Sequence, residues 1–152
     1  MSIIAPGTPV PEFKLKTEDG NPFGRDDLAG RTTVLVFYPA AFSSVCTDQF
    51  QIYQEVLEDF AAEGARLYGV SCDQSDSQTA FRESLGVSIP MLSDFEPKGA
   101  VSRAFGAYWA PDGKSTRALV IVGPDQTVTW SWIGEHPGVL PGANLIFDAL
   151  AA

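Results

Sequence analysis

Cys46 is the residue of this chain whose type and position best suit chemistry. It comes shortly after an unbroken run of β-branched and aromatic residues, Thr32 to Tyr38, which is typical of a strand buried on both faces. It also begins a series of apolar residues with helical spacing. A cysteine in the first turn of a helix meets unpaired N–H groups and the positive end of the helix dipole, which stabilise a thiolate. We therefore predict that Cys46 is a nucleophile.

Two residues before Cys46 could act with it. Ser43 lies three positions earlier, and residues three apart share a face of a helical turn, so its hydroxyl and the sulfur could address one small ligand. Ser43 could equally serve only as the N-cap of the helix. Pro39 forces the chain out of the preceding strand, and that could be its whole role.

The rest of the chain predicts the elements that would position these residues. Apolar residues at steps of four, three, four and three predict one helix from Ser43 to Gly64; they are Cys46, Phe50, Tyr53, Leu57 and Phe60. Further strands are predicted at 66–72, 91–93, 117–122 and 127–133, and further helices at 75–85, 100–105 and 143–150. Residues 13–16 and the turn residues 19–21 predict a hairpin. The result is an α/β fold with a central mixed sheet flanked by helices, an N-terminal β-hairpin and one domain over 1–152.

Composition narrows the class of protein. The chain has 152 residues with 19 acidic and 10 basic side chains, a net charge of −9, which disfavours binding to nucleic acid or an anionic membrane. No segment is typical of a secretory signal or a membrane span, so we expect a cytoplasmic protein. Two cysteines and one histidine at distant positions give no zinc-site spacing, and no metal or organic cofactor is expected.

The string P-x-x-x-[ST]-x-x-C, met here by Pro39, Ser43 and Cys46, resembles the active-site motif of the peroxiredoxin (thiol-specific antioxidant) family. The strings IPMLSD, GAV and AFG between residues 89 and 106 resemble the stretch that precedes that family's catalytic arginine. The resemblance runs from about residue 6 to the last helix and is strongest to the AhpE-like one-cysteine branch. It implies a thioredoxin-like fold and a homodimer.

The resemblance also implies a fourth catalytic residue, an arginine at the start of a late strand. Arg117 stands there, and Arg103 is its competitor. The planar guanidinium of Arg117 could hold the thiolate and a peroxide oxygen together. The implied activity is a thiol-dependent peroxidase that reduces hydrogen peroxide and organic hydroperoxides through a sulfenic acid at Cys46, covered by Pro39. An external thiol, a thioredoxin, a glutaredoxin-like protein or a small thiol, would complete the cycle.

Alternatives stay open at this point. Cys72 ends a strand expected beside the Cys46 strand, so it could be a resolving thiol in a two-cysteine cycle or a structural residue. The chain could also be a thioredoxin-like disulfide-exchange or binding protein, although Ser43 stands where C-x-x-C has its first thiol. Gln49 replaces the acid or related polar residue usual in the family, which puts its role in doubt. His136 is expected to face solvent.

Trp130 and Trp132 share one face of the strand predicted at 127–133, opposite Thr129 and Ser131. This pattern predicts packing of the two indoles under a helix. If the strand lies at the edge of the sheet, its lack of lysine or proline would suit pairing between subunits.

Overall fold

The computed structural model describes residues 3–151, and at its centre is a seven-stranded mixed sheet in the order β2-β1-β5-β4-β3-β8-β9. The strands are β1 (Lys14–Thr17), β2 (Pro22–Gly24), β3 (Thr32–Phe37), β4 (Ala65–Ser71), β5 (Met91–Ser93), β8 (Ala118–Val122) and β9 (Val128–Ile133), with β6 (Tyr108–Trp109) and β7 (Lys114–Ser115) forming a separate small hairpin. The helices are η1 (Arg25–Leu28), α1 (Ser44–Glu55), α2 (Leu57–Ala62), α3 (Ser75–Leu85), α4 (Ala100–Ala104), η2 (Ala110–Asp112) and α5 (Ala143–Ala151). The predicted mixed sheet and the N-terminal hairpin are confirmed.

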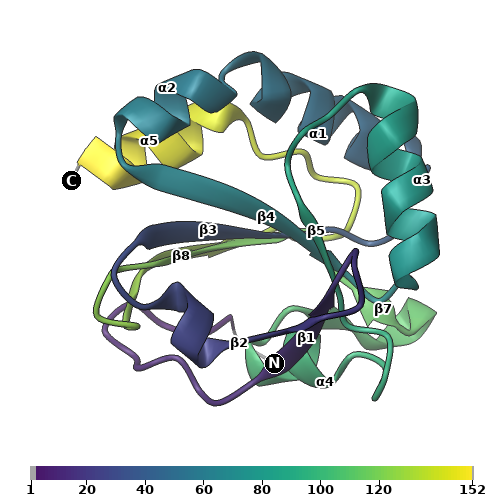
Figure 1. The fold of residues 1–152 in the computed structure, drawn as a ribbon, viewed down its shortest axis with the longest axis horizontal. Coiled ribbons are helices and arrows are strands. Elements are labelled where there is room, and N and C mark those ends of the chain that lie inside the picture. The colour runs from purple at the N-terminus through teal and green to yellow at the C-terminus, as the bar shows by residue number, and fades with distance from the viewer. Residues whose placement is uncertain (1–2, 152) are drawn as a thin grey trace.

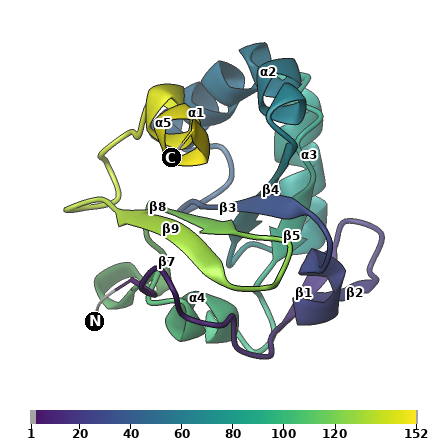
Figure 2. The same ribbon diagram turned by 90° about the vertical axis from the view of Figure 1, so that its left-hand side faces the viewer.

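Helices cover both faces of this sheet. Figures 1 and 2 show α1, α2, α3 and α5 on one face, and α4 with the β6–β7 hairpin on the other. Each face has its own apolar cluster. The first includes Phe50, Phe60 and Ile146 from α1, α2 and α5, and the second includes Val101 of α4 and Leu28 of η1. We call these two layers the α1 side and the α4 side.

Strand β3 is central because it can bury both of its faces. It pairs parallel with β4 and antiparallel with β8. Side chains alternate along a strand, so Val34 and Val36 enter the cluster on the α1 side while Leu35 and Phe37 enter the cluster on the α4 side. The unbroken apolar run predicted this arrangement, and the structure confirms it.

The prediction of one helix from Ser43 to Gly64 was wrong. The chain forms two helices, α1 and α2, separated at Val56, whose backbone leaves the helical region with φ −114° and ψ 18°. The β-branched side chain of Val56 disfavours helix, and the Val56 N–H bonds the carbonyl of Tyr53 three residues back. The apolar spacing continues across this break, so periodicity could not reveal it.

The last strand, β9, lies at one edge of the sheet and pairs only with β8 among the strands described. Trp130 and Trp132 pack against the cluster on the α1 side, as does Phe147 of α5. The predicted packing of both indoles under a helix is therefore confirmed. Within residues 3–151, no helix is long and apolar enough to cross a membrane.

Candidate active site

Cys46 lies in the first turn of α1, where the sequence placed it. It is the third residue of the helix, its side chain is 0% exposed, and no acidic residue stands in the same turn. The first N–H groups of a helix have no partners within the helix, and they carry the positive end of its dipole. This position stabilises a negative charge on sulfur, which is what a nucleophilic thiol requires.

Ser43 takes the N-cap position of α1, but its side chain makes no capping hydrogen bond. Its hydroxyl oxygen is buried and has no partner among the described residues, while its carbonyl accepts the N–H of Thr47. A buried hydroxyl is normally paired. The unpaired Oγ is therefore available to a small ligand beside Cys46.

Arg117 is held next to the start of α1 by strand pairing. Strand β8 runs antiparallel to β3 with Ala118 opposite Phe37, and the same register continued by one residue brings Arg117 opposite Tyr38. The Arg117 side chain is 1% exposed, its Nη1 donates to Gln49 Oε1 at 2.6 Å, and its Nε donates to the carbonyl of Pro137 at 2.9 Å. Gln49 is one helical turn beyond Cys46, so this contact joins the arginine to the thiol-bearing face of α1.

Arg103, the competitor, lies elsewhere. It is exposed, it donates to the carbonyl of Lys98, and its guanidinium stacks 4.0 Å above the ring of Tyr108. The guanidinium of Arg103 therefore binds its partners on the α4 side of the molecule. Of the two arginines, Arg117 is the one that the fold brings to Gln49 and the start of α1.

Gln49 stands where the resemblance implied an acid or a related polar residue, and the structure gives it a partner on each side. Tyr53 donates its one hydroxyl proton to the carbonyl of Pro141 at 2.9 Å, so the same oxygen accepts the Gln49 Nε2–H at 3.2 Å. This leaves Gln49 Oε1 to accept from Arg117. Burial raises the pKa of Tyr53 to about 12, which keeps the proton in place. The amide is oriented, and the arginine is held without a neutralising carboxylate.

Pro39 and Tyr38 connect β3 to the loop before Cys46. Both are buried, and the hydroxyl of Tyr38 donates to the sulfur of Met91 at 3.5 Å. Burial raises the pKa of Tyr38 well above its usual value, and the neighbouring Asp73 and Cys46 add to this rise. Tyr38 is a neighbour of the thiol that the sequence did not reveal, because it ended a run that indicated only a buried strand.

The loop between Pro39 and Ser43 is strained. Phe42 has φ +66°, in the left-handed region that a bulky residue rarely adopts, at a cost of about 1–3 kcal/mol. Its ring is 59% exposed and meets Phe81 of α3 edge-on, with the centroids 5.5 Å apart. Other contacts must offset this strain.

Cys72 lies on the other side of the sheet from Cys46. Its sulfur is 3.5 Å from the hydroxyl of Ser115 in β7, and that hydroxyl is 2.7 Å from the hydroxyl of Ser102 in α4. Cys46 instead belongs to the cluster on the α1 side. Burial raises the pKa of Cys72, so less of it is thiolate at neutral pH. Both cysteines are free of disulfides.

The remaining candidates lie outside this site. His136 is exposed, and its Nδ1 accepts the N–H of Gly138 at 3.1 Å. Within residues 3–151, no group of three or more histidine, cysteine or carboxylate residues could hold a metal ion.

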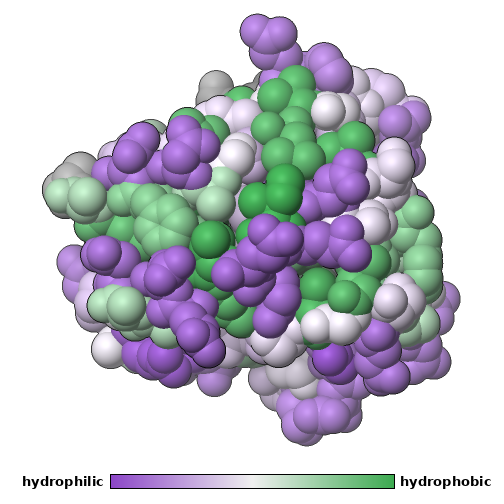
Figure 3. Space-filling view, turned by 90° about the horizontal axis from the view of Figure 1, so that it is seen from above, coloured by the Kyte–Doolittle hydropathy of each residue, from purple (hydrophilic) through white to green (hydrophobic). Residues whose placement is uncertain are grey.

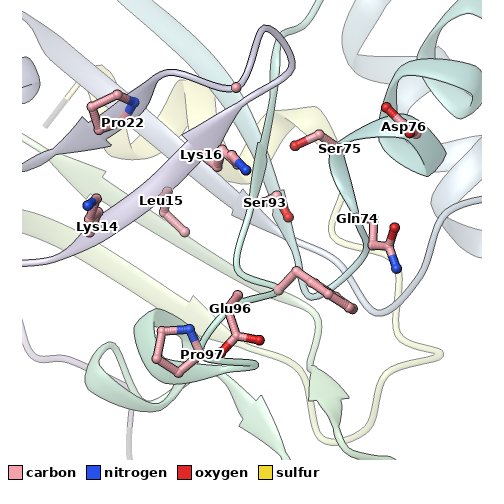
Figure 4. Close-up of a pocket in the computed structure, with 12 residues that line it drawn as sticks. Lys14, Leu15, Lys16, Pro22, Gln74, Ser75, Asp76, Ser93, Glu96 and Pro97 are labelled. Atoms are coloured by element: carbon pink, nitrogen blue, oxygen red, sulfur yellow. The ribbon is translucent and has the colours of Figure 1, made fainter.

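A surface cavity of about 750 Å³ lies between β1, the start of α3 and the segment after β5, lined among others by Lys14, Lys16, Gln74 and Ser93 (Figure 4). Cys46 and its predicted partners do not line it.

Comparison with known proteins identifies the family of this chain. The sequence model of the AhpC/TSA family matches residues 6–131. A putative peroxiredoxin of Mycobacterium tuberculosis is 37% identical over 119 residues, 77% of this chain and 74% of that protein. The alkyl hydroperoxide reductase E of the same organism is 26% identical over 147 residues, 96% of this chain and 95% of that protein.

Solved structures share the fold. The crystal structure of AhpC from Enterococcus faecalis superposes with a TM-score of 0.88 at 25% identity, over 98% of this chain and 92% of that one. Peroxidoxin BcpB of Mycobacterium tuberculosis superposes with a TM-score of 0.83 at 27% identity, over 97% and 95% of the two chains. The chain belongs to the AhpC/TSA family, whose relatives here are named as peroxiredoxins. The predicted family and the thioredoxin-like fold are confirmed.

Proposed function

We propose that this protein is a thiol-dependent peroxidase that uses Cys46 as its nucleophile in antioxidant defence. The observation that carries the proposal is the position of Cys46 in the first turn of α1, three residues after Ser43, whose buried hydroxyl is unpaired among the described residues. Family membership supports the peroxidase class. Hydrogen peroxide and organic hydroperoxides are the proposed substrates, and no metal or organic cofactor enters the proposed reaction.

The proposed reaction transfers one oxygen atom to sulfur. The Cys46 thiolate attacks the OH-bearing oxygen of the peroxide; an S–O bond forms, the O–O bond breaks, and the electron pair leaves with the second oxygen. That oxygen takes a proton and departs as water or an alcohol, leaving a sulfenic acid. The Ser43 hydroxyl, the N–H groups of α1 and Arg117 are positioned to stabilise the moving charge without reorganising, and Pro39 covers the sulfur.

A thiol must then return Cys46 to its starting state. We propose an external thiol, supplied by a thioredoxin, a glutaredoxin-like protein or a small thiol. The first thiol displaces water from the sulfenic acid to form a mixed disulfide, and a second releases Cys46. The hydrogen bond of Cys72 to Ser115, on the α4 side of the sheet, favours this one-cysteine cycle over resolution by Cys72.

Peroxide consumption with an added dithiol tests the proposal. Wild type and Cys72→Ser should turn over, while Cys46→Ser should not. Intact mass after one equivalent of peroxide should show a gain of one oxygen. Equal consumption by wild type and Cys46→Ser would refute Cys46 as the nucleophile, and a loss of two hydrogens would show that Cys72 closes a disulfide.

We further propose a single-domain, cytoplasmic homodimer. A reducing compartment suits two free cysteines. The edge of β9 beyond Val128, whose own N–H and carbonyl are bonded to Thr8 and Gly7, could pair with a second copy. The surface over the α1 side also carries an apolar band (Figure 3), and Ile52 of α1 is 39% exposed. Light scattering should give twice the 16.3 kDa of one chain. Ile133→Lys, which adds a charge to the end of β9, should weaken the dimer; an unchanged dimer would direct attention to the apolar band.

A further inference from the structure

The backbone of the loop before Cys46, residues 39–42, is hydrogen-bonded to the carboxylate of Asp73. The N–H of Ala41 donates to Asp73 Oδ2 at 2.8 Å. Within residues 3–151, this is the one hydrogen bond that joins the backbone of residues 39–42 to a side chain. Ala41 lies between Pro39 and the strained Phe42, whose ring is largely exposed. The Asp73 contact therefore supplies the hydrogen bond that complements the packing of this loop, in which Ala41 meets the cluster on the α1 side and Phe42 meets Phe81.

Asp73 is itself held in place from several elements. The hydroxyl of Ser71, at the end of β4, donates to the same Oδ2 at 2.8 Å. Gln78 of α3 is fully buried, and its Nε2 donates to Ser71 Oγ and to the carbonyl of Leu92 in β5, each at 2.8 Å. Ser93 Oγ donates to the carbonyl of Asp73. Two strands, β4 and β5, together with helix α3 thus fix the position and direction of one acceptor.

The anchored loop determines where the reacting groups lie. Ala41 is two residues before Ser43, whose hydroxyl is unpaired, and five before Cys46, whose sulfur is fully buried. A shift of this loop would move Ser43 away from the sulfur and expose the thiol. Attack on a peroxide requires alignment of several groups, and a misplacement of about 1 Å can cost 100-fold in rate. Simple alkylation requires an accessible thiolate but not this alignment.

We propose that Asp73 is a positioning residue, which holds the Cys46 loop in the conformation that reacts with peroxide by accepting the N–H of Ala41. The inference rests on the proposed use of Cys46 as the nucleophile. Asp73 does not touch the substrate. Its effect passes through the backbone of the loop, so an oxygen acceptor at this position is required and a negative charge is not.

Two rates measured on the folded protein test this. The first is the rate of sulfenic acid formation at Cys46 with hydrogen peroxide, followed by rapid quench and intact mass. The second is the rate at which iodoacetamide alkylates Cys46, located by peptide mass. Asp73→Ala should slow oxidation about 10- to 100-fold and speed up alkylation. Asp73→Asn, which keeps a carbonyl acceptor for Ala41, should recover most of both changes.

Asp76→Asn is the matched control, because it makes the same change of charge at an exposed position in the first turn of α3. Both of its rates should equal those of wild type. Thermal unfolding of every variant separates a moved loop from a destabilised protein. Should Asp73→Ala fail to fold, Ser71→Ala takes its place; it removes one bond to the carboxylate and should change both rates in the same directions, by less.

Wild-type rates in Asp73→Ala, or in Ser71→Ala where that variant is needed, would overturn the proposal. So would an Asp73→Asn variant no better than Asp73→Ala. Cys46→Ser is measured alongside. It distinguishes a failure of the proposed peroxidase function from a failure of the proposed role of Asp73. If wild type itself shows no oxidation that depends on Cys46, the proposed function fails first. If it does, and the Asp73 variants match it, only the role of Asp73 is wrong.

Discussion

The two polar residues proposed to act with Cys46, Arg117 and Ser43, differ in their hydrogen bonding. Arg117 is held in place by two hydrogen bonds, from Nη1 to Gln49 and from Nε to the carbonyl of Pro137. Ser43 has a buried hydroxyl with no partner among the described residues. Leaving such a group unpaired costs about 1–3 kcal/mol. A residue that is costly for the resting protein and lies beside a nucleophile is best explained by the ligand that would pair with it.

Substitution of Ser43 should therefore separate activity from stability. Ser43→Ala removes an unpaired group, so the free energy of unfolding should fall by less than about 1 kcal/mol or even rise. The rate of Cys46 oxidation should fall about 100-fold, as for the loss of one preorganised donor. Ser43→Thr keeps the hydroxyl and should retain most of the rate. Urea unfolding and rapid-quench oxidation measure the two effects; a large loss of stability without loss of rate would mean that Ser43 is only a cap.

Tyr53 predicts an alkaline limit to stability. Its pKa is raised by burial to about 12 from 10.0, so between these values the unfolded chain loses a proton that the folded protein keeps. Stability from this group is complete below pH 10 and is lost as pH rises through 12, by about 2–3 kcal/mol in all. Other groups titrate here too, so the variant Tyr53→Phe provides the comparison. The unfolding free energy of the variant should fall less steeply above pH 10, and parallel curves would contradict the prediction.

At the scale of elements, strands were easier to predict than helix ends. Strand β3 was recognisable because both of its faces are buried, which removes polar residues from the sequence itself. The interruption of the helix at Val56 could not be recognised from the sequence, because the apolar residues of α1 and α2 keep one continuous spacing. The two-residue strands β6 and β7 were also missed, because two residues carry no periodicity.

Helices α2 and α5 should be coupled through one aromatic pair. Phe60 and Phe147 stack with centroids 4.3 Å apart and planes at 15°. Phe60→Ala should cost about 3–5 kcal/mol of unfolding free energy, because the residue is fully buried. The double variant with Phe147→Ala should show a coupling of about 0.5–1.5 kcal/mol. Denaturant unfolding of the four proteins measures it; strictly additive costs would show that the contact contributes nothing beyond burial.

At the scale of the whole molecule, the sheet assembles a site from residues far apart in the chain. Cys46, Ser43 and Pro39 were predictable because eight consecutive residues carry them. Arg117 required the resemblance to a family, since only the register of β8 against β3 brings it near. The contacts of Ala41 with Asp73 and of Gln49 with Arg117 could not be predicted, because polar contacts between distant segments depend on tertiary geometry.

The net charge of −9 should influence the choice of reducing thiol. An anionic thiol such as mercaptosuccinate is repelled by the overall field, and salt screens that field beyond about 10 Å at 0.1 M. Its rate of reducing oxidised Cys46 should rise several-fold between low and physiological salt, whereas the rate for neutral dithiothreitol should stay constant. Stopped-flow or quenched mass measurements compare them. An anionic rate that falls with salt would show that local positive charge outweighs the field.

The burial of Cys72 beneath β7 and α4 has a practical consequence. In the folded protein its raised pKa and its serine neighbours leave it slow to react, while in denaturant both thiols become equally open to alkylation. The chain therefore carries its own internal standard. In a two-label mass experiment Cys72 would count the molecules and Cys46 would report how many are oxidised, so occupancy could be read as a ratio within one polypeptide, even in a crude extract.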